Sequence, residues 1–469
     1  MRRTRIVATL GPATRDPDTV RALVEAGVDV VRLNAAHDRP EVHQASAATA
    51  REQADALGVA IGVLVDLPGP KMRTGPIGGD AVELDAGTTF VLGPTEGPGD
   101  AQRVATTIPD LAALTNAGDE IYLADGAIVL RVERVDGDDV VTEVVRGGEL
   151  RSRKGMFLPG AERLVPSFTA ADETALQMAA DIGADFVGMS FVRSADDVAA
   201  MRRRVRSHPR PPQLVAKIET RAALGDLTAI VDGSDAVMVA RGDLGIQVDL
   251  ARVALLQKEI IQVCNTTGTP VVTATQMLES MTDAPLPTRA EVADVANAVL
   301  DGTDALMLSE ETAVGAYPVQ TVATMARVAV EAEAWPRSRP TPAGALGRAD
   351  ATGWAVAHAA IAAAEDLGVA AILSPTRTGA TPRRLSAFRP RVPIVALSPS
   401  ERVLAGLGMT WGVVACAGRE SDDSDDVVDL AIDDARAAGA VQQGQLVAVV
   451  AGSPGSGAGT TDLVRIARA

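Results

Sequence analysis

The sequence reads Q-L-V-A-K-I-E at residues 213–219 and A-V-M-V-A-R-G-D-L-G at residues 236–245, two short apolar runs that both end in charge. Such runs, rich in β-branched residues, are typical of buried parallel strands whose C-terminal ends open into a polar site. The charged residues at these two ends are Lys217, Glu219, Arg241 and Asp243. Because the functional groups of a barrel gather at the C-terminal ends of its strands, we expect the four side chains to meet at one rim.

Two carboxylates, a lysine and an arginine beside glycine suit a divalent metal that holds a phosphorylated anion. Gly242 and Gly245 would let the backbone approach a ligand closely. The simpler alternative is a set of salt-bridged rim residues without a function. Four charges at two strand ends are costly to bury unless they are used, so we favour the functional interpretation.

Eight strand segments, each followed by a helix, predict an α/β fold of the (β/α)8 TIM-barrel type. The first three strands end at Pro12, Asn34 and Pro70, with helices expected at 16–26 and 41–57 between them. The pattern returns with a helix at 170–182 and strands at 186–191, 213–219, 236–240, 270–277 and 305–311. The predicted barrel domain therefore occupies residues 1–71 and 158–335.

Residues 72–157 interrupt the barrel with short alternating runs separated by Gly and Asp turns, which predict a small antiparallel β unit. Inserted after the third strand, it is expected to be a small β-barrel lid that stands over the barrel mouth and excludes water on closing. An inert insertion is the alternative. Residues 336–344 have the composition of a linker. The helix and five strands expected in 345–469 predict a C-terminal three-layer α/β domain.

The net charge of −17 argues against a nucleic-acid partner, because the phosphate backbone would be repelled. No apolar run is long enough to cross a membrane, so we expect a cytoplasmic protein with no membrane partner. The only cysteines, Cys264 and Cys416, match no metal spacing and no disulfide framework. Among the 44 basic residues four are lysines, Lys71, Lys154, Lys217 and Lys258. A lysine in so arginine-rich a chain is expected where a compact ammonium is needed.

The other predicted strand ends also carry polar residues. They are Arg32 and Asn34 with His37 beyond, Asp66 followed by Lys71 and Arg73, then Thr275 and Glu311. Guanidinium groups suit phosphate oxygens. Glu219 and Asp243 offer the hard oxygen ligands that Mg²⁺ or Mn²⁺ prefers, with positions left for substrate and water.

Several motifs in this order resemble those of pyruvate kinase: I-V-A-T-L-G-P-A-T at 6–14, K-I-E at 217–219, M-V-A-R-G-D-L-G at 238–245, A-T-Q-M-L-E-S-M at 274–281 and P-T-R-A-E-V-A-D-V-A-N-A-V-L-D-G at 287–302. The resemblance covers nearly the whole chain, including the end of the insertion at Arg153–Gly160. It implies phosphoryl transfer from phosphoenolpyruvate to ADP, which yields pyruvate and ATP, and it implies a homotetramer. In-line phosphoryl transfer depends on clustered cations and positioning, which agrees with the residues at the strand ends.

The resemblance also implies roles for individual residues. By similarity, Glu219 and Asp243 hold the divalent metal, and Lys217 neutralises the migrating phosphoryl group and the enolate. Thr275 belongs to the route that protonates the enolate, and Gly242 contacts the substrate. Glu311 is a further catalytic candidate, and the phosphate and nucleotide contacts are Arg32, His37, Arg73 and Lys154, the last arriving with the lid.

The sequence departs from the commonest family pattern near the monovalent-cation site. In relatives that need K⁺, an Asn, a Ser, an Asp and a Thr supply its ligands; here Asn34 and Asp66 remain, but Ala36 and Leu67 replace the hydroxyls. A nearby glutamate of many relatives is Lys71 here. We therefore predict that Lys71 supplies the monovalent charge and that K⁺ is not required. An exposed lysine after a Pro turn is the alternative.

A second site is predicted in the C-terminal domain, where S-P-T-R-T-G-A-T runs from a strand into a helix. The hydroxyls and backbone N–H groups of Thr376, Thr378, Gly379 and Thr381 form a candidate cradle for a phosphometabolite effector, completed by the loop at 452–459. It resembles the family's sugar-phosphate pocket, although a plain connector has the same composition.

Two other functions stay open. A metal-dependent lyase or aldolase that uses phosphoenolpyruvate or pyruvate would share the barrel, but it needs no nucleotide contacts. An effector-binding paralogue with weak activity is suggested by Ala35, Ala36 and Glu310, where many relatives have an aromatic residue, serine and glycine.

Overall fold

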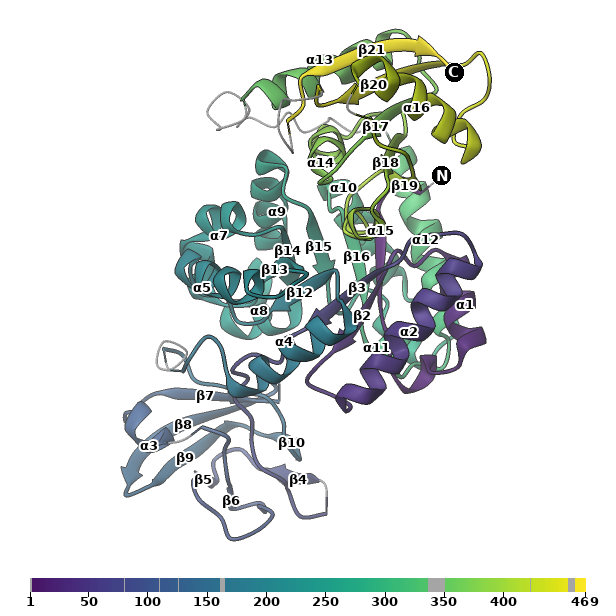
Figure 1. Ribbon diagram of the computed structural model, residues 1–469. Helices are drawn as coiled ribbons and strands as arrows, with labels where there is room; N and C mark the ends of the chain where they lie inside the picture. Colours follow the sequence, from purple (N-terminus) through teal and green to yellow (C-terminus); the bar gives the residue numbers. More distant parts are fainter. Residues whose placement is uncertain are drawn as a thin grey trace.

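The computed structural model describes residues 2–79, 81–108, 110–124, 126–160, 165–335, 351–421, 423–453 and 460–469. Figure 1 shows three parts: a barrel in the middle, an all-β part at one side and a C-terminal part on the opposite side. The predicted linker at 336–344 lies outside the described residues.

Eight parallel strands close the barrel in the order β1-β16-β15-β14-β13-β12-β3-β2, as predicted. Their bounds are β1 Arg5–Thr9, β2 Val30–Asn34, β3 Gly62–Asp66, β12 Phe186–Met189, β13 Gln213–Ile218, β14 Ala236–Ala240, β15 Val271–Ala274 and β16 Ala305–Leu308. Every strand is buried along almost its whole length, because side chains fill the barrel on one face and helices cover the other. The two runs that suggested the fold are therefore neighbouring strands, and Lys217 lies opposite Met238 in their register.

Helices surround the barrel, and several of them begin at a side-chain cap. They are α1 Pro17–Ala26, α2 Pro40–Ala56, α4 Ala170–Ile182, α5 Ala195–Arg206, α6 Arg221–Gly225, α7 Leu227–Gly233, α8 Arg241–Gln247, α9 Leu250–Thr267, α10 Arg289–Asp301, α11 Glu310–Ala313 and α12 Pro318–Ala334. The Asp16 carboxylate accepts the Thr19 N–H at the start of α1, and Gly27 ends that helix at φ 113°. Thr288 and Glu291 form a reciprocal capping box on α10.

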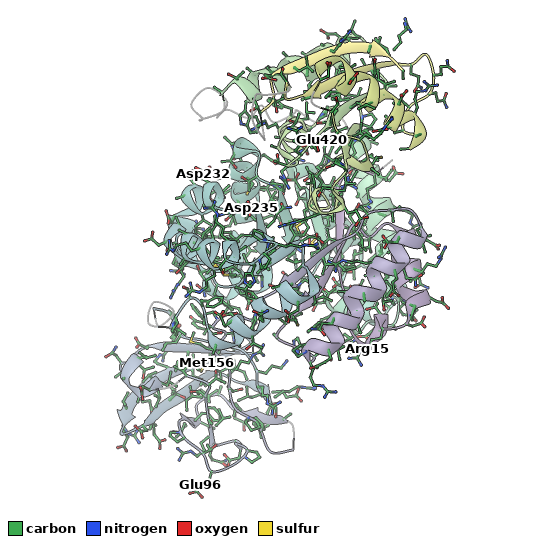
Figure 2. All side chains as sticks on the ribbon, in the orientation of Figure 1. Arg15, Glu96, Met156, Asp232, Asp235 and Glu420 are labelled. Carbon is green, nitrogen blue, oxygen red and sulfur yellow. The ribbon has the colours of Figure 1, made fainter. Side chains whose placement is uncertain are left out.

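The insertion forms a six-stranded sheet in the order β11-β7-β8-β9-β5-β6 and a two-stranded sheet of β10 and β4. The strands are β4 Ala81–Leu84, β5 Thr89–Leu92, β6 Arg103–Val104, β7 Glu120–Leu123, β8 Ile128–Asp136, β9 Asp139–Arg146, β10 Gly148–Arg151 and β11 Met156–Phe157, with the short helix α3 Leu111–Leu114. Their inward side chains share one apolar core. In Figure 2, Met156 lies where this part meets the barrel and Glu96 at its far end. We call this part the lid.

The C-terminal part is a five-stranded sheet in the order β19-β18-β17-β20-β21, parallel except for the antiparallel edge strand β21. The strands are β17 Ala371–Pro375, β18 Ile394–Ser398, β19 Val413–Ala417, β20 Leu446–Ala451 and β21 Leu463–Arg468. The helices are α13 Ala351–Asp366, α14 Ala380–Ala387, α15 Glu401–Ala405 and α16 Ser424–Ala437. Separate apolar clusters with α13 and with α16 lie on its two faces, which gives the predicted three layers.

A buried arginine joins this C-terminal part to the barrel. Arg389, just after α14, donates to both carboxylate oxygens of Asp304, which precedes β16, at 2.7 and 3.0 Å. Its guanidinium also donates to Asn265 Oδ1 and the Gly302 carbonyl and lies 5.1 Å from the Trp411 ring centroid. Among the described helices none is long and apolar enough to cross a membrane.

Candidate active site

Lys217 stands at the centre of the charged cluster at the end of β13. Its ammonium lies 2.9 Å from Glu219 Oε1 and 3.1 Å from Asp66 Oδ1, and it donates to Ser190 Oγ at 2.8 Å. Burial alone would lower the pKa of Lys217, but the carboxylates of Asp66 and Glu219 outweigh this effect and raise the pKa above its ordinary value. The site therefore holds a permanent ammonium at neutral pH.

Arg32 adds a second fixed cation from the end of β2. It donates to Asp66 Oδ2 through Nη2 at 2.7 Å and Nε at 2.9 Å, and to the Thr9 hydroxyl through Nη1 at 3.0 Å. Burial would raise the pKa of Asp66, but Lys217 and Arg32 hold it below its ordinary value. Asp66 thus stays ionised and orients both cations.

Glu219 and Asp243 are the predicted metal ligands. Glu219 is buried, and its Oε2 accepts the Phe191 backbone N–H at 2.7 Å. Burial raises the pKa of Glu219, and the negative charge of Asp243 raises it further against the opposing effect of Lys217. Two carboxylates that repel each other in this way suit a divalent cation, which relieves the repulsion. Among the described residues there is no group of three or more His, Cys, Asp or Glu side chains that could hold a metal ion.

Lys71 reaches this site from the chain that leaves β3 for the lid. Its ammonium binds Asp243 Oδ1 at 2.8 Å, and both side chains are about a quarter exposed, at 29% and 26%. Asn34 instead accepts the Ala36 backbone N–H at 3.2 Å. The structure thus brings Lys71 to a predicted metal ligand, whereas Asp66 is engaged by Lys217 and Arg32.

Thr275 follows β15 in the left-handed region, with φ 69°, and Gln276 follows it with φ 53°. A β-branched residue rarely adopts this conformation, so the turn is strained. The Thr275 hydroxyl accepts the Gly242 N–H at 2.9 Å and donates to the Ala274 carbonyl at 2.6 Å. These contacts link the predicted proton route to the start of α8.

Arg241 does not join the other three charges at the rim. Its Nη1 pairs with Asp294 of α10 at 2.7 Å, and its Nη2 donates to the Thr275 carbonyl at 2.5 Å. The expectation that Arg241 meets Lys217, Glu219 and Asp243 at the rim is therefore wrong, because α8 starts at this residue and its side chain points to Asp294 of α10. Its hydrogen bond to the Thr275 carbonyl supports the strained turn.

The predicted nucleotide contacts lie nearer the lid. Burial lowers the pKa of His37, the charges of Arg73 and Arg32 lower it further, and Asp38 and Glu310 oppose the change. Arg73 donates to the Arg153 carbonyl at 3.1 Å and bridges Gly155, so it joins the two chain segments that enter and leave the lid. His37 thus lies close enough to Arg32 and Arg73 for their charges to act on it, and the charge of the exposed Glu310 acts on it as well.

Lys154 lies on the lid and is exposed. Glu311 is buried below the rim, where its carboxylate accepts the backbone N–H groups of Leu278 at 3.2 Å and Ser309 at 2.6 Å. These bonds fix the turns after β15 and β16. Glu311 thus has the contacts of a residue that positions these turns.

The candidate effector residues lie together around the start of α14, but much of their bonding capacity is used internally. The Thr376 hydroxyl accepts the Gly379 N–H at 2.9 Å, and the buried Thr381 hydroxyl contacts Thr461 Oγ1 at 2.7 Å. Thr378 Oγ1 accepts the Ala380 N–H at 3.4 Å. In the predicted completing loop, residues 454–459 lie outside the described residues.

Two contacts of this site were not predicted from the sequence. Ser190, which accepts from Lys217 and donates to the Leu67 carbonyl, reads as an ordinary polar residue at the end of β12. Its position at a barrel strand end was the available signal. The Phe191 N–H that holds Glu219 depends on a positive φ of 54°, for which no residue type in the sequence gave a signal.

Known proteins resemble the chain throughout. The family model for the pyruvate kinase barrel domain matches residues 1–322, and the model for the pyruvate kinase alpha/beta domain matches residues 354–467. Pyruvate kinase from Mycobacterium tuberculosis is 41% identical over 470 residues, which cover 100% of this chain and 98% of the relative. The enzyme from Geobacillus stearothermophilus is 39% identical over 473 residues, which cover 99% and 80%.

A solved structure agrees with these matches. The crystal structure of a pyruvate kinase from Cryptosporidium parvum superposes with a TM-score of 0.89 at 32% identity, covering 100% of this chain and 96% of the other. Pyruvate kinases use phosphoenolpyruvate and ADP and need a divalent metal. With both family models matched and full-length relatives at this identity, the chain belongs to the pyruvate kinase family.

Proposed function

We propose that the cluster around Lys217 transfers the phosphoryl group of phosphoenolpyruvate to ADP with Mg²⁺ or Mn²⁺ bound by Glu219 and Asp243. The observation that carries the proposal is the buried Lys217 ammonium held between Glu219 and Asp66 at 2.9 and 3.1 Å. A buried cation fixed in this way suits charge that develops on a transferred phosphoryl group and on an enolate. The metal, when bound, would polarise substrate oxygens and neutralise their charge.

The chain's own residues have distinct tasks in this proposal. Lys217 and Arg32 lie ready to neutralise phosphoryl oxygens without moving, because Asp66 fixes both of them. The strained turn places the Thr275 hydroxyl beside the Gly242 N–H, where it can join the route of the proton to the enolate. His37, Arg73 and Lys154 would bind the nucleotide phosphates, with Lys154 carried in as the lid closes and excludes water.

The test is a coupled assay with phosphoenolpyruvate and ADP on Lys217→Ala and on Lys258→Ala as the matched control. Lys258 is an exposed lysine of α9. Loss of the buried ammonium should reduce kcat by at least about 10²–10³-fold, as loss of one preorganised donor does, whereas Lys258→Ala should keep full activity. Circular dichroism checks that both variants fold. Comparable activity of Lys217→Ala and wild type would disprove the role of Lys217.

We also propose that Lys71 makes the activity independent of K⁺. Its ammonium lies 2.8 Å from Asp243 Oδ1, so a monovalent positive charge is already present at the site. Activity in tetramethylammonium buffer should then change less than about twofold when K⁺ is added, while Lys71→Met should lose activity in the absence of K⁺ because the compact ammonium is gone. A large rise of wild-type activity with K⁺ would rule the proposal out.

The same assay separates the remaining alternatives. A paralogue with weak activity, suggested by Ala35, Ala36 and Glu310, would bind phosphoenolpyruvate but turn over slowly. A lyase would consume phosphoenolpyruvate or pyruvate without ADP. We favour the kinase because Arg73, His37 and Arg32 share one neighbourhood beside the rim.

The remaining proposals concern the domain bounds, an effector site, the location and the assembly. The chain is divided into a barrel domain at 1–71 and 158–335, a lid at 72–157 and a C-terminal domain at 345–469. A phosphometabolite binds near Thr376, Thr378, Gly379 and Thr381, and the protein is a cytoplasmic homotetramer. The effector is tested by thermal shift with fructose bisphosphate, glucose 6-phosphate and AMP, where absence of stabilisation by all three leaves only a connector.

A further inference from the structure

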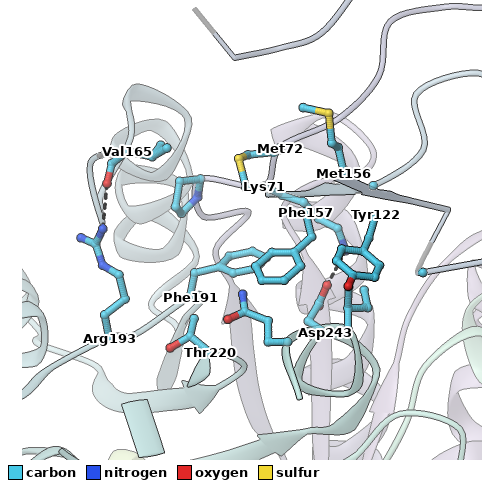
Figure 3. Close-up of a pocket in the computed structure, with 15 residues that line it drawn as sticks. Lys71, Met72, Tyr122, Met156, Phe157, Val165, Phe191, Arg193, Thr220 and Asp243 are labelled. Carbon is cyan, nitrogen blue, oxygen red and sulfur yellow. Dashed lines mark hydrogen bonds and ion pairs between the residues drawn. The ribbon is translucent and has the colours of Figure 1, made fainter. Parts of the chain in front are cut away.

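A pocket lies between the lid and the barrel on the side of α8, beside the cluster of Lys217 and Arg32 but lined by other residues. Its empty volume, which includes space open to solvent, is about 630 Å³. Figure 3 shows Tyr122 and Phe157 from the lid opposite Phe191 from the barrel, with the Lys71–Asp243 ion pair at one end.

The lining concentrates the protein's scarce aromatic residues. The whole chain has 6 Phe, 3 Trp and 2 Tyr, yet Tyr122, Phe157 and Phe191 all line this pocket. Tyr122 and Phe157 have ring centroids 6.1 Å apart, and Met72 and Met156 add polarisable side chains that adapt to a flat ring. The walls therefore favour a planar aromatic ligand.

The polar groups of the pocket favour a neutral ligand. Lys71 and Asp243 neutralise each other, and the Arg193 guanidinium is engaged by Asp197 and the Val165 carbonyl. The buried Gln247 uses its side-chain oxygen to accept the Arg221 N–H at 3.0 Å. Its amide nitrogen donates no hydrogen bond to another described residue, so this donor suits an acceptor atom on the ligand.

The pocket is also connected to the predicted metal ligands. Phe191, whose ring lines it, holds Glu219 through its backbone N–H at 2.7 Å in the left-handed region. Asp243, the other ligand, lines the pocket directly. A molecule packed against Phe191 would therefore change the setting of both carboxylates, and by linkage the metal would change the affinity for that molecule by the same factor.

We propose that this pocket binds a neutral, planar heteroaromatic ring with a hydrogen-bond acceptor for Gln247, and that the bound ring couples to the metal site. The ring bridges the lid and the barrel, since Phe157 belongs to one and Ile246 to the other. It fixes the lid at one angle and so controls closure. The ring could come from a free heteroaromatic metabolite or from the base of the nucleotide substrate, which share this chemistry.

The experiment measures binding of 7-methoxycoumarin by fluorescence to wild type, Ile246→Trp, Phe157→Ala and Leu250→Ala, with adenine as a competitor. Ile246→Trp fills the barrel wall of the pocket, and Phe157→Ala removes part of the lid wall. Leu250 is exposed on the next helix and does not line the pocket, so it is the matched apolar control. We expect at least tenfold weaker binding in the first two variants and unchanged binding in the control.

Coupling is read from Mn²⁺ binding, followed by electron paramagnetic resonance, with and without the coumarin. The apparent Kd of Mn²⁺ should change severalfold in the wild type and stay constant in Ile246→Trp. Displacement of the probe by ADP as well as by adenine assigns the ring to the nucleotide, whereas displacement by adenine alone assigns it to a free effector. Absence of probe binding, equal binding in all four proteins, or an Mn²⁺ affinity indifferent to the probe would overturn the proposal.

Discussion

Substitution of Arg389 tests the buried contact that joins the barrel to the C-terminal part. Arg389→Ala removes two bonds to Asp304, one to Asn265 and one to the Gly302 carbonyl. Within the described part of the chain, the carboxylate of Asp304, which is only 4% exposed, would then keep the backbone N–H groups of Val271 and Trp411, at 3.0 and 3.3 Å, as its partners. A buried carboxylate without its cation typically destabilises by about 3–5 kcal/mol, so we expect a loss of that size.

Urea unfolding followed by tryptophan fluorescence measures this loss, because Trp411 lies against the Arg389 guanidinium. The matched control is Arg21→Ala, whose exposed pair with Glu25 on α1 should contribute less than about 0.5 kcal/mol. Adding Asp304→Asn to Arg389→Ala should recover a large part of the loss, because the unpaired charge is gone. A loss below about 1 kcal/mol for Arg389→Ala, or no recovery in the double variant, would refute the reasoning.

Two further predictions concern stability elsewhere. Burial raises the pKa of Asp185 to about 6 despite Arg51 nearby, so the folded state favours its protonated form and the free energy of unfolding should fall as pH rises from about 4 to about 6. Asp185→Asn should remove this loss, up to about 3 kcal/mol. Urea titrations at several pH values measure it, and parallel curves for both proteins would contradict the prediction. Gly268→Ala should destabilise the fold by about 1–3 kcal/mol, because at φ 71° the added Cβ would lie 2.3 Å from Trp354 Cη2. The control is Gly58→Ala, at φ 68° with open space around it, which should destabilise the fold less in thermal melting. Equal melting temperatures of the two variants would show that the contact with Trp354 is unimportant.

The barrel was predictable because its physical signal is local. Buried parallel strands need continuous apolar runs, and eight such runs separated by helical segments can be counted in this chain, so their number and order could be predicted from the sequence. Asp16 and Thr288, which cap α1 and α10 in the structure, are residue types that favour helix starts. The five strands of the C-terminal part followed from the same pattern.

The details of the site were harder to predict, because they depend on which way each side chain turns. Arg241 and Asp243 are two residues apart at the start of α8, yet Arg241 pairs with Asp294 and only Asp243 reaches Lys71. The contact between Lys71 and Asp243 joins residues 172 positions apart. The left-handed turns at Phe191 and Thr275 place non-glycine residues in a conformation that residue type does not signal.

The position of the lid in the chain has a practical consequence. It leaves the barrel after β3 and returns before β12, and these two strands are hydrogen-bonded neighbours, with Leu64 opposite Phe186. Excision of the whole insertion and its replacement by a short flexible linker would therefore leave the closed ring intact. Such a shortened chain would isolate the affinity of the bare rim for metal and substrate from everything that the covering part adds.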